Sequence, residues 1–118
     1  MCIRDRAWAV AEGLTSSDRV AMFGWSYGGY AALVAASRTP QIYRCVIAGA
    51  AVTDPEMQVN YYRYRLRGRS KVEQLRMWDD SVSPINEVEQ VNVPILLIHG
   101  TVDQRVPLEH AGHEGGVG

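Results

Sequence analysis

The chain has 118 residues, of which 47% are hydrophobic and 21% charged, and its formal net charge is −1. This length supports one domain with its own core and excludes a second, and the near-neutral charge gives no reason to expect nucleic acid or a membrane as a partner. No apolar run approaches the roughly 20 residues that span a bilayer, so we expect a soluble protein. The sequence leaves its compartment, cytoplasm or periplasm, open. Two cysteines, Cys2 and Cys45, make neither a disulfide framework nor a zinc-binding spacing, so no metal and no cofactor is expected.

The two ends of the chain differ in character from its middle. The opening MCIRDR is similar to translated adapter sequence, which predicts that residues 1–6 are not native. The tail GHEGGVG is rich in glycine and breaks off where a helix is expected. We therefore expect residues 1–118 to be one partial domain, truncated at both ends.

Helix and strand patterns alternate along the first half of the chain. Residues 7–13 are typical of the end of a helix stopped by Gly13. Residues 19–23 (RVAMF) form a short apolar run that predicts a buried strand. Small and apolar side chains in residues 27–37 predict a helix packed closely on a sheet, and residues 45–52 form a second apolar run.

The second half continues this alternation with weaker helices and a stronger strand. Residues 57–66 and 72–78 each have the apolar spacing of one short helix. Residues 94–99 (PILLIH) form a continuous apolar run, which favours a strand covered on both faces. Strands that alternate with helices predict an α/β fold, in which helices flank a parallel sheet.

The segment GWSYGGY, residues 24–30, lies between the first predicted strand and the following helix. It contains G-x-S-x-G in the strand–turn–helix context that indicates a nucleophile elbow at Ser26. A projecting serine needs a sharp, strained turn, so we expect crowding to exclude a Cβ at Gly24 and at Gly28. The backbone N–H of Tyr27 is then one donor of an oxyanion hole. The alternative is a glycine-rich turn with an incidental serine.

This segment resembles the nucleophile region of the prolyl oligopeptidase family, particularly its dipeptidyl-peptidase and acylaminoacyl-peptidase-like branches. The resemblance implies a partial α/β-hydrolase fold and a serine peptidase that hydrolyses peptide substrates through an acyl-enzyme on Ser26, without a cofactor. A carboxylesterase on the same fold and a non-catalytic relic domain are the alternatives. Further matches are DRV at 18–20, SPIN at 83–86, VPILLIHG at 93–100 and D-x-RVP at 103–107.

The candidate catalytic acid is Asp103. In α/β-hydrolases the chain order is serine, acid, histidine, and Asp103 lies in the loop after the strand at residues 94–99. Loops at the carboxyl ends of parallel strands commonly carry the site, and the resemblance also implies the acid at Asp103. A turn or helix-capping aspartate is the alternative. Asp54 is a rival acid, although the pair Asp54-Pro55 is more typical of a turn.

No histidine of the chain is well placed to be the catalytic base. His99 at a strand end suits a hydrogen-bonded structural role. His110 and His113 follow Asp103 too closely, because another strand–helix–strand unit takes about 30 residues. We therefore expect the base downstream of the 118 residues, and the chain alone to be inactive. The resemblance also implies an upstream tyrosine hydroxyl as second oxyanion donor and an upstream propeller that selects substrates by size.

Residues 59–64 (VNYYRY) are the candidate substrate-binding segment. Members of the family wall the S1 pocket with aromatic residues from this region, so the resemblance implies that Tyr62, together with Tyr61, contacts the P1 side chain. Packing of these rings into the domain is the alternative. Residues 54–56 (DPE) stand where the dipeptidyl peptidases usually have a tryptophan, which argues against a strict post-proline preference.

Overall fold

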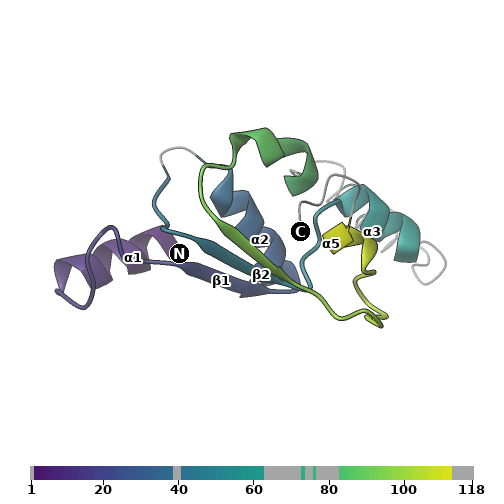
Figure 1. Ribbon diagram of the computed structural model, residues 1–118. Coiled ribbons are helices and arrows are strands. Elements are labelled where there is room, and N and C mark those ends of the chain that lie inside the picture. The colour runs from purple at the N-terminus through teal and green to yellow at the C-terminus, as the bar shows by residue number, and fades with distance from the viewer. Residues whose placement is uncertain (1, 39–40, 63–72, 74–75, 77–82, 113–118) are drawn as a thin grey trace.

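The computed structural model describes residues 2–38, 41–62, 73, 76 and 83–112 (Figure 1). Its strands alternate with helices, so the predicted α/β class is confirmed. Among the described residues, no helix has the length and apolar character needed to cross a membrane. The elements in chain order are α1 (Cys2–Ala11), β1 (Met22–Trp25), α2 (Tyr27–Ala36), β2 (Val46–Gly49), α3 (Pro55–Tyr62), the 3-10 helix η1 (Pro84–Gln90), β3 (Ile95–Ile98) and α5 (Glu109–Gly112).

The three strands form a parallel sheet in the order β1-β2-β3. The pairing is in register, so that Trp25 lies opposite Gly49 and Gly49 opposite Ile98. Because all strands run the same way, their carboxyl ends lie at one edge of the sheet (Figure 1). Ser26, Ala50 and His99 each follow the last residue of a strand, and they stand side by side at this edge.

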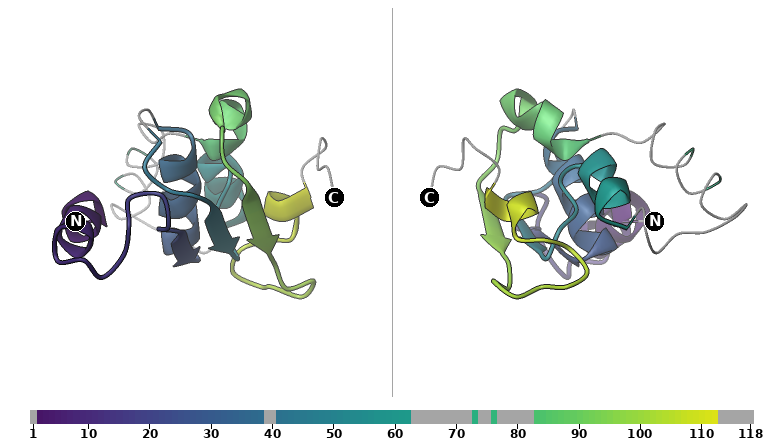
Figure 2. Two further views of the ribbon diagram at one scale, coloured as in Figure 1. Left: turned by 60° about the vertical axis from the view of Figure 1, so that its left-hand side comes forward. Right: turned by 90° about the vertical axis from the view of Figure 1, so that its right-hand side faces the viewer.

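Helix α2 packs on one face of this sheet, as Figure 2 shows. Ala32 and Ala36 lie fully buried against Val46, and Leu33 packs on Ala48. The small side chains let the helix come close to the strands, which confirms the predicted packing. The core of the described chain is therefore the layer between α2 and the first two strands.

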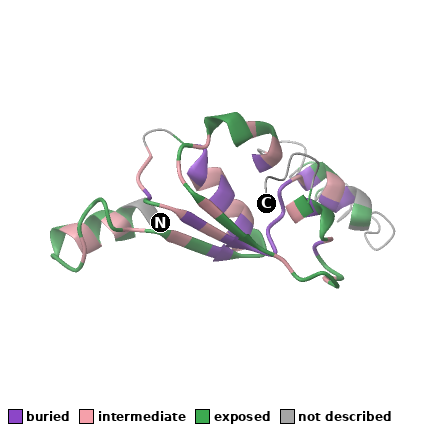
Figure 3. Cartoon of the chain, in the orientation of Figure 1, coloured by how far each residue is buried: buried purple, intermediate pink, exposed green. Residues whose placement is uncertain are grey.

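The opposite face of the sheet is apolar and open to solvent (Figure 3). Phe23 is 63% exposed, Trp25 54%, Leu96 55% and Ile98 42%. The expectation that the strand at residues 94–99 is covered on both faces is therefore wrong for the described part of the chain. The reason is that β3 is an edge strand, and α2 lies over one face of the sheet only.

Helix α1 ends at the glycine that the sequence indicates. Gly13 has a φ of +72°, and the N–H of Leu14 donates to the carbonyl of Ala9 at 3.0 Å while the N–H of Gly13 donates to that of Val10 at 3.1 Å. These two bonds are a Schellman motif, which satisfies the last carbonyls of a helix. The predicted helix at residues 72–78 lies almost entirely outside the described residues.

Candidate active site

Ser26 occupies a sharp turn between β1 and α2. Its φ of 57° and ψ of −117° fall in a region that residues with a side chain rarely adopt. The Ser26 N–H donates to the carbonyl of Gly49 at 2.8 Å, and its own carbonyl accepts from the N–H of Tyr30 at 3.1 Å. The turn is thus tied to the neighbouring strand on one side and to the helix on the other. Ser26 itself is exposed.

Close backbone packing explains which glycines this turn requires. A Cβ on Gly24 would lie 1.9 Å from the carbonyl oxygen of Gly28, and a Cβ on Gly29 would lie 2.8 Å from the Cβ of Ala51. A Cβ on Gly28, in contrast, meets nothing within 4 Å. The expectation for Gly24 is therefore confirmed, whereas the one for Gly28 is wrong. The carbonyl of Gly28 crowds the position of a Cβ on Gly24, but a Cβ on Gly28 itself would point into open space.

A third crowded glycine lies on the neighbouring strand. A Cβ on Gly49 would lie 2.0 Å from the ring of Trp25, which lies against the bare backbone of Gly49. The G-x-S-x-G motif does not include Gly49, and only the strand register of Trp25 with Gly49 reveals the need for a glycine there.

Tyr27 is the first residue of α2, directly after Ser26. The first N–H groups of a helix have no partner within the helix and carry its partial positive charge. The Tyr27 N–H is therefore at the position where an oxyanion donor is expected. The Tyr27 side chain is 66% exposed and its ring lies 5.5 Å, centroid to centroid, from that of Tyr30.

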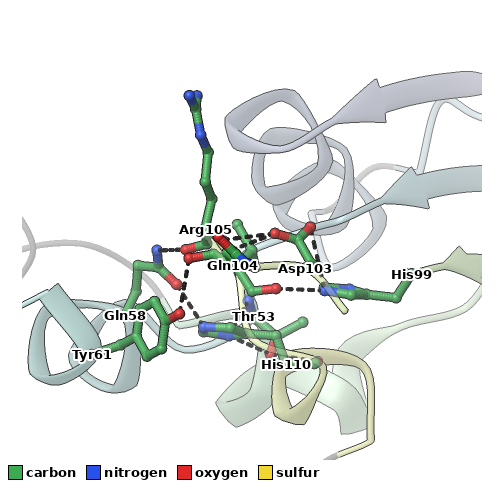
Figure 4. Close-up of polar contacts among 9 residues, drawn as sticks. Thr53, Gln58, Tyr61, His99, Asp103, Gln104, Arg105 and His110 are labelled. Carbon is green, nitrogen blue, oxygen red and sulfur yellow. Dashed lines mark hydrogen bonds and ion pairs between the residues drawn. The ribbon is translucent and has the colours of Figure 1, made fainter. Parts of the chain in front are cut away.

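Asp103 lies in the loop after β3, on the same edge of the sheet as Ser26. Its Oδ1 accepts from the N–H of Arg105 at 2.8 Å and from that of Val106 at 2.9 Å, while Oδ2 lies 3.9 Å from Nε2 of His99 (Figure 4). The N–H groups of Val106 and Arg105 hold the pKa of Asp103 below its ordinary value. Asp103 is thus an ionised carboxylate with one oxygen fixed by the turn, and its side chain is 22% exposed.

The rival acid Asp54 has a local role. Its Oδ1 accepts from the N–H of Glu56 at 3.0 Å and from that of Met57 at 3.3 Å, and its carbonyl accepts from the N–H of Gln58. These bonds satisfy N–H groups in the first turn of α3, as an N-cap aspartate does. The interpretation of Asp54 as a capping residue agrees with this geometry.

Both described histidines make hydrogen bonds that fix them in the structure. The side chain of His99 is 4% exposed, and its Nε2 donates to the carbonyl of Val106 at 2.7 Å. His110 is 2% exposed and is held between Thr53 and Gln58. His113 lies outside the described residues. Both described imidazoles are buried, and the partners given above are other residues than Ser26.

The two candidate substrate-binding tyrosines lie at the end of α3. The hydroxyl of Tyr61 donates to the carbonyl of Gln104 at 2.8 Å, which ties α3 to the loop of Asp103 (Figure 4). The Tyr61 side chain is 42% exposed. Tyr62 ends the helix, and its side chain lies outside the described part of the chain.

Comparison with known proteins assigns this arrangement to a family. The model of the prolyl oligopeptidase family matches residues 2–113, which is almost the whole chain. The chain belongs to the prolyl oligopeptidase family. This confirms the family indicated by the GWSYGGY segment.

Curated relatives and solved structures agree with membership in the prolyl oligopeptidase family. Prolyl endopeptidase FAP of Mus musculus is 33% identical over an alignment of 114 positions, which covers 92% of this chain and 15% of that protein. Dipeptidyl aminopeptidase BIII of Pseudoxanthomonas mexicana is 31% identical over 109 residues, covering 84% of this chain and 16% of its own length. The chain therefore spans about one sixth of these relatives.

Among solved structures, a puromycin hydrolase superposes with a TM-score of 0.72 at 24% identity, over 91% of this chain and 17% of its own. An esterase of Pyrococcus furiosus superposes with a TM-score of 0.66 at 19% identity, over 91% of this chain and 42% of its own. At these identities the two structures establish the shared α/β-hydrolase fold, which confirms the predicted partial fold.

The structure adds contacts that the sequence did not indicate. His110 bonds to Thr53 and Gln58, which lie 57 and 52 residues away in the chain, and Gln58 donates to the carbonyl of Arg105 in the loop of Asp103. No local pattern distinguishes Gln58 from any other polar residue in a helix. The signal is purely three-dimensional, because it requires the contact between α3 and α5.

Proposed function

We propose that the parent of this chain is a serine peptidase that hydrolyses peptide bonds through an acyl-enzyme on Ser26. The observation that carries the proposal is the strained turn at Ser26, at the same sheet edge as the ionised carboxylate of Asp103, in a chain of the prolyl oligopeptidase family. A backbone in this sparsely populated region persists only where the surroundings enforce it, as they do at functional sites.

The division of roles follows from the geometry. Ser26 attacks the scissile carbonyl, and the N–H of Tyr27 stabilises the oxyanion that forms. Asp103 accepts a hydrogen bond from the catalytic imidazole through Oδ2, because Oδ1 already accepts from two N–H groups. β1 and β3 are two strand spacings apart, about 10 Å, which leaves room for an imidazole between the serine and the acid.

The base is supplied from outside the 118 residues. His99 and His110 are both held by hydrogen bonds, and a serine without a base keeps an ordinary, weakly nucleophilic hydroxyl. Loss of one triad member costs about 10⁴ to 10⁶ in kcat. The isolated chain is therefore inactive as a peptidase. The substrate is a peptide, and Tyr61 and Tyr62 contact its P1 side chain.

A fluorophosphonate probe tests the assignment on the parent protein. Only an activated serine reacts quickly with the probe, so we expect rapid labelling of the wild type and none of Ser26→Ala. Hydrolysis of peptide amides then distinguishes a peptidase from a carboxylesterase, which would cleave only the matching esters. An unlabelled, folded parent would indicate a relic domain, and peptidase turnover by the isolated 118-residue chain that Ser26→Ala abolishes would refute the external base.

A further inference from the structure

A buried chain of hydrogen bonds runs from the start of α3 to the backbone of the Asp103 loop (Figure 4). The N–H groups of Thr53 and Asp54 donate to Nδ1 of His110 at 3.2 and 3.4 Å. Nε2 of His110 lies 2.8 Å from Oε1 of Gln58, and Nε2 of Gln58 donates to the carbonyl of Arg105 at 2.8 Å.

The N–H groups of Thr53 and Asp54 fix the orientation of the side chains in this series of hydrogen bonds. Because Nδ1 of His110 accepts from two backbone N–H groups, the ring is neutral and carries its proton on Nε2. That proton goes to Oε1 of Gln58, which turns the Gln58 NH₂ group toward the carbonyl of Arg105. Gln58 is 7% exposed and His110 2%, so an unmade bond here leaves a polar group without solvent to replace it.

The peptide unit between Arg105 and Val106 links these hydrogen bonds to the candidate acid. Its carbonyl, that of Arg105, accepts from Gln58, and its N–H, that of Val106, donates to Oδ1 of Asp103. Asp103 therefore lies in a turn whose backbone accepts a hydrogen bond from the side chain of Gln58. The charged and titratable groups that face Asp103 are His99 and Arg105, and neither belongs to α3 or α5.

We propose that Gln58, oriented by His110, is a positioning residue that sets the carboxylate of Asp103 for the catalytic imidazole. The inference rests on the proposed peptidase function. Gln58 contacts neither the substrate nor the reacting atoms; it acts through the peptide unit between Arg105 and Val106. Its loss lets the turn shift, and a shift of about 1 Å in a catalytic group costs up to about 100-fold in rate.

The test compares Gln58→Met with Gln41→Met in the parent peptidase. Gln41 is a matched control, because its amide also makes two hydrogen bonds, to the carbonyl of Ala36 and from the N–H of Tyr43, but it lies before β2, at the other edge of the sheet. For Gln58→Met we expect kcat to fall about 10- to 100-fold with little change in KM. The acidic limb of the kcat/KM profile moves to lower pH, because a displaced carboxylate no longer raises the pKa of the catalytic imidazole.

Gln41→Met lowers the unfolding temperature but leaves kcat and the acidic limb unchanged. If Gln58→Met behaves in the same way, the positioning role is wrong and the hydrogen bonds are structural only. Should Gln58→Met fail to fold, Gln58→Asn replaces it, since it keeps a buried amide that is one methylene too short to reach both partners. A wild-type parent without Ser26-dependent turnover refutes the proposed function itself, so the two failures are distinguishable.

Discussion

Gly24→Ala tests whether the turn at Ser26 depends on close backbone contact. The new methyl carbon would lie 1.9 Å from the carbonyl oxygen and 2.3 Å from the carbonyl carbon of Gly28. Non-bonded contacts of a Cβ below 3.0 Å essentially never occur, so β1 and the first turn of α2 must separate by about 1 Å. These atoms are backbone, which cannot rotate away as a side chain could.

The structure places this cost at the upper end of the overpacking range. Inserting one methyl group into a packed site costs about 1–3 kcal/mol where side chains can adjust, and here they cannot. We expect the free energy of unfolding to fall by about 3 kcal/mol, a large part of the roughly 5–15 kcal/mol that stabilises a typical domain. For a chain of this size the unfolding temperature then drops by about 10 °C.

Urea unfolding of the wild type, Gly24→Ala and Gly28→Ala measures the effect. Gly28 offers the matched control, because an added Cβ there meets nothing within 4 Å and the residue lies in a helix. We expect Gly28→Ala to leave the stability unchanged or to raise it by up to about 1 kcal/mol. Equal midpoints for the two variants at equal m-values would refute the packing argument.

Three further predictions concern the turn, the acid and α1. Ser26→Gly should be about 1 kcal/mol more stable than Ser26→Ala in thermal unfolding, because glycine accepts φ 57° without strain. Equal stabilities of the two variants would mean that the backbone at this turn is not strained. The lowered pKa of Asp103 contributes stability that is present above about pH 4 and is lost as the pH falls below it. The difference in unfolding free energy between wild type and Asp103→Asn should therefore narrow in acid. A difference that stays constant with pH would mean that the pKa of Asp103 is ordinary. Gly13→Ala should cost about 1 kcal/mol in urea unfolding, because Gly13 has φ +72°, whereas a neutral effect would show that α1 does not need this cap.

The sequence predicted local features well and contacts between distant segments poorly. The turn at Ser26 and the stop at Gly13 are encoded by neighbouring residues, and both were found. The first strand was placed at residues 19–23, whereas β1 is Met22–Trp25. The extent of β1 is set by its pairing with β2. This pairing includes Gly24 and Trp25, which the motif suggests belong to the turn.

The candidate site shows the same limit. Asp103 is predicted to be the acid because it follows a strong apolar strand, and order along the chain suffices for that prediction. Gln58 has no signal in the sequence, and His110 is considered from the sequence only as a rejected base, because the contact of these two residues depends on α3 meeting α5. The prediction for Gly28 is wrong for a related reason. The motif places two glycines symmetrically about Ser26, but an added Cβ would point into the turn at Gly24 and into open space at Gly28.

Strain in the described backbone lies at one edge of the sheet. Ser26 at φ 57° and Ala50 at φ 43° are the described non-glycine residues with positive φ, and they follow directly on the paired residues Trp25 and Gly49. Each is held by a strand hydrogen bond, Ser26 N–H to Gly49 and Ala50 N–H to Ile98 at 2.7 Å. The ladder thus extends one residue beyond the strands and includes both residues of costly conformation. Because the same ladder fixes the end of β3 through Ile98, the sheet that carries the turn at Ser26 also sets where the loop of Asp103 begins.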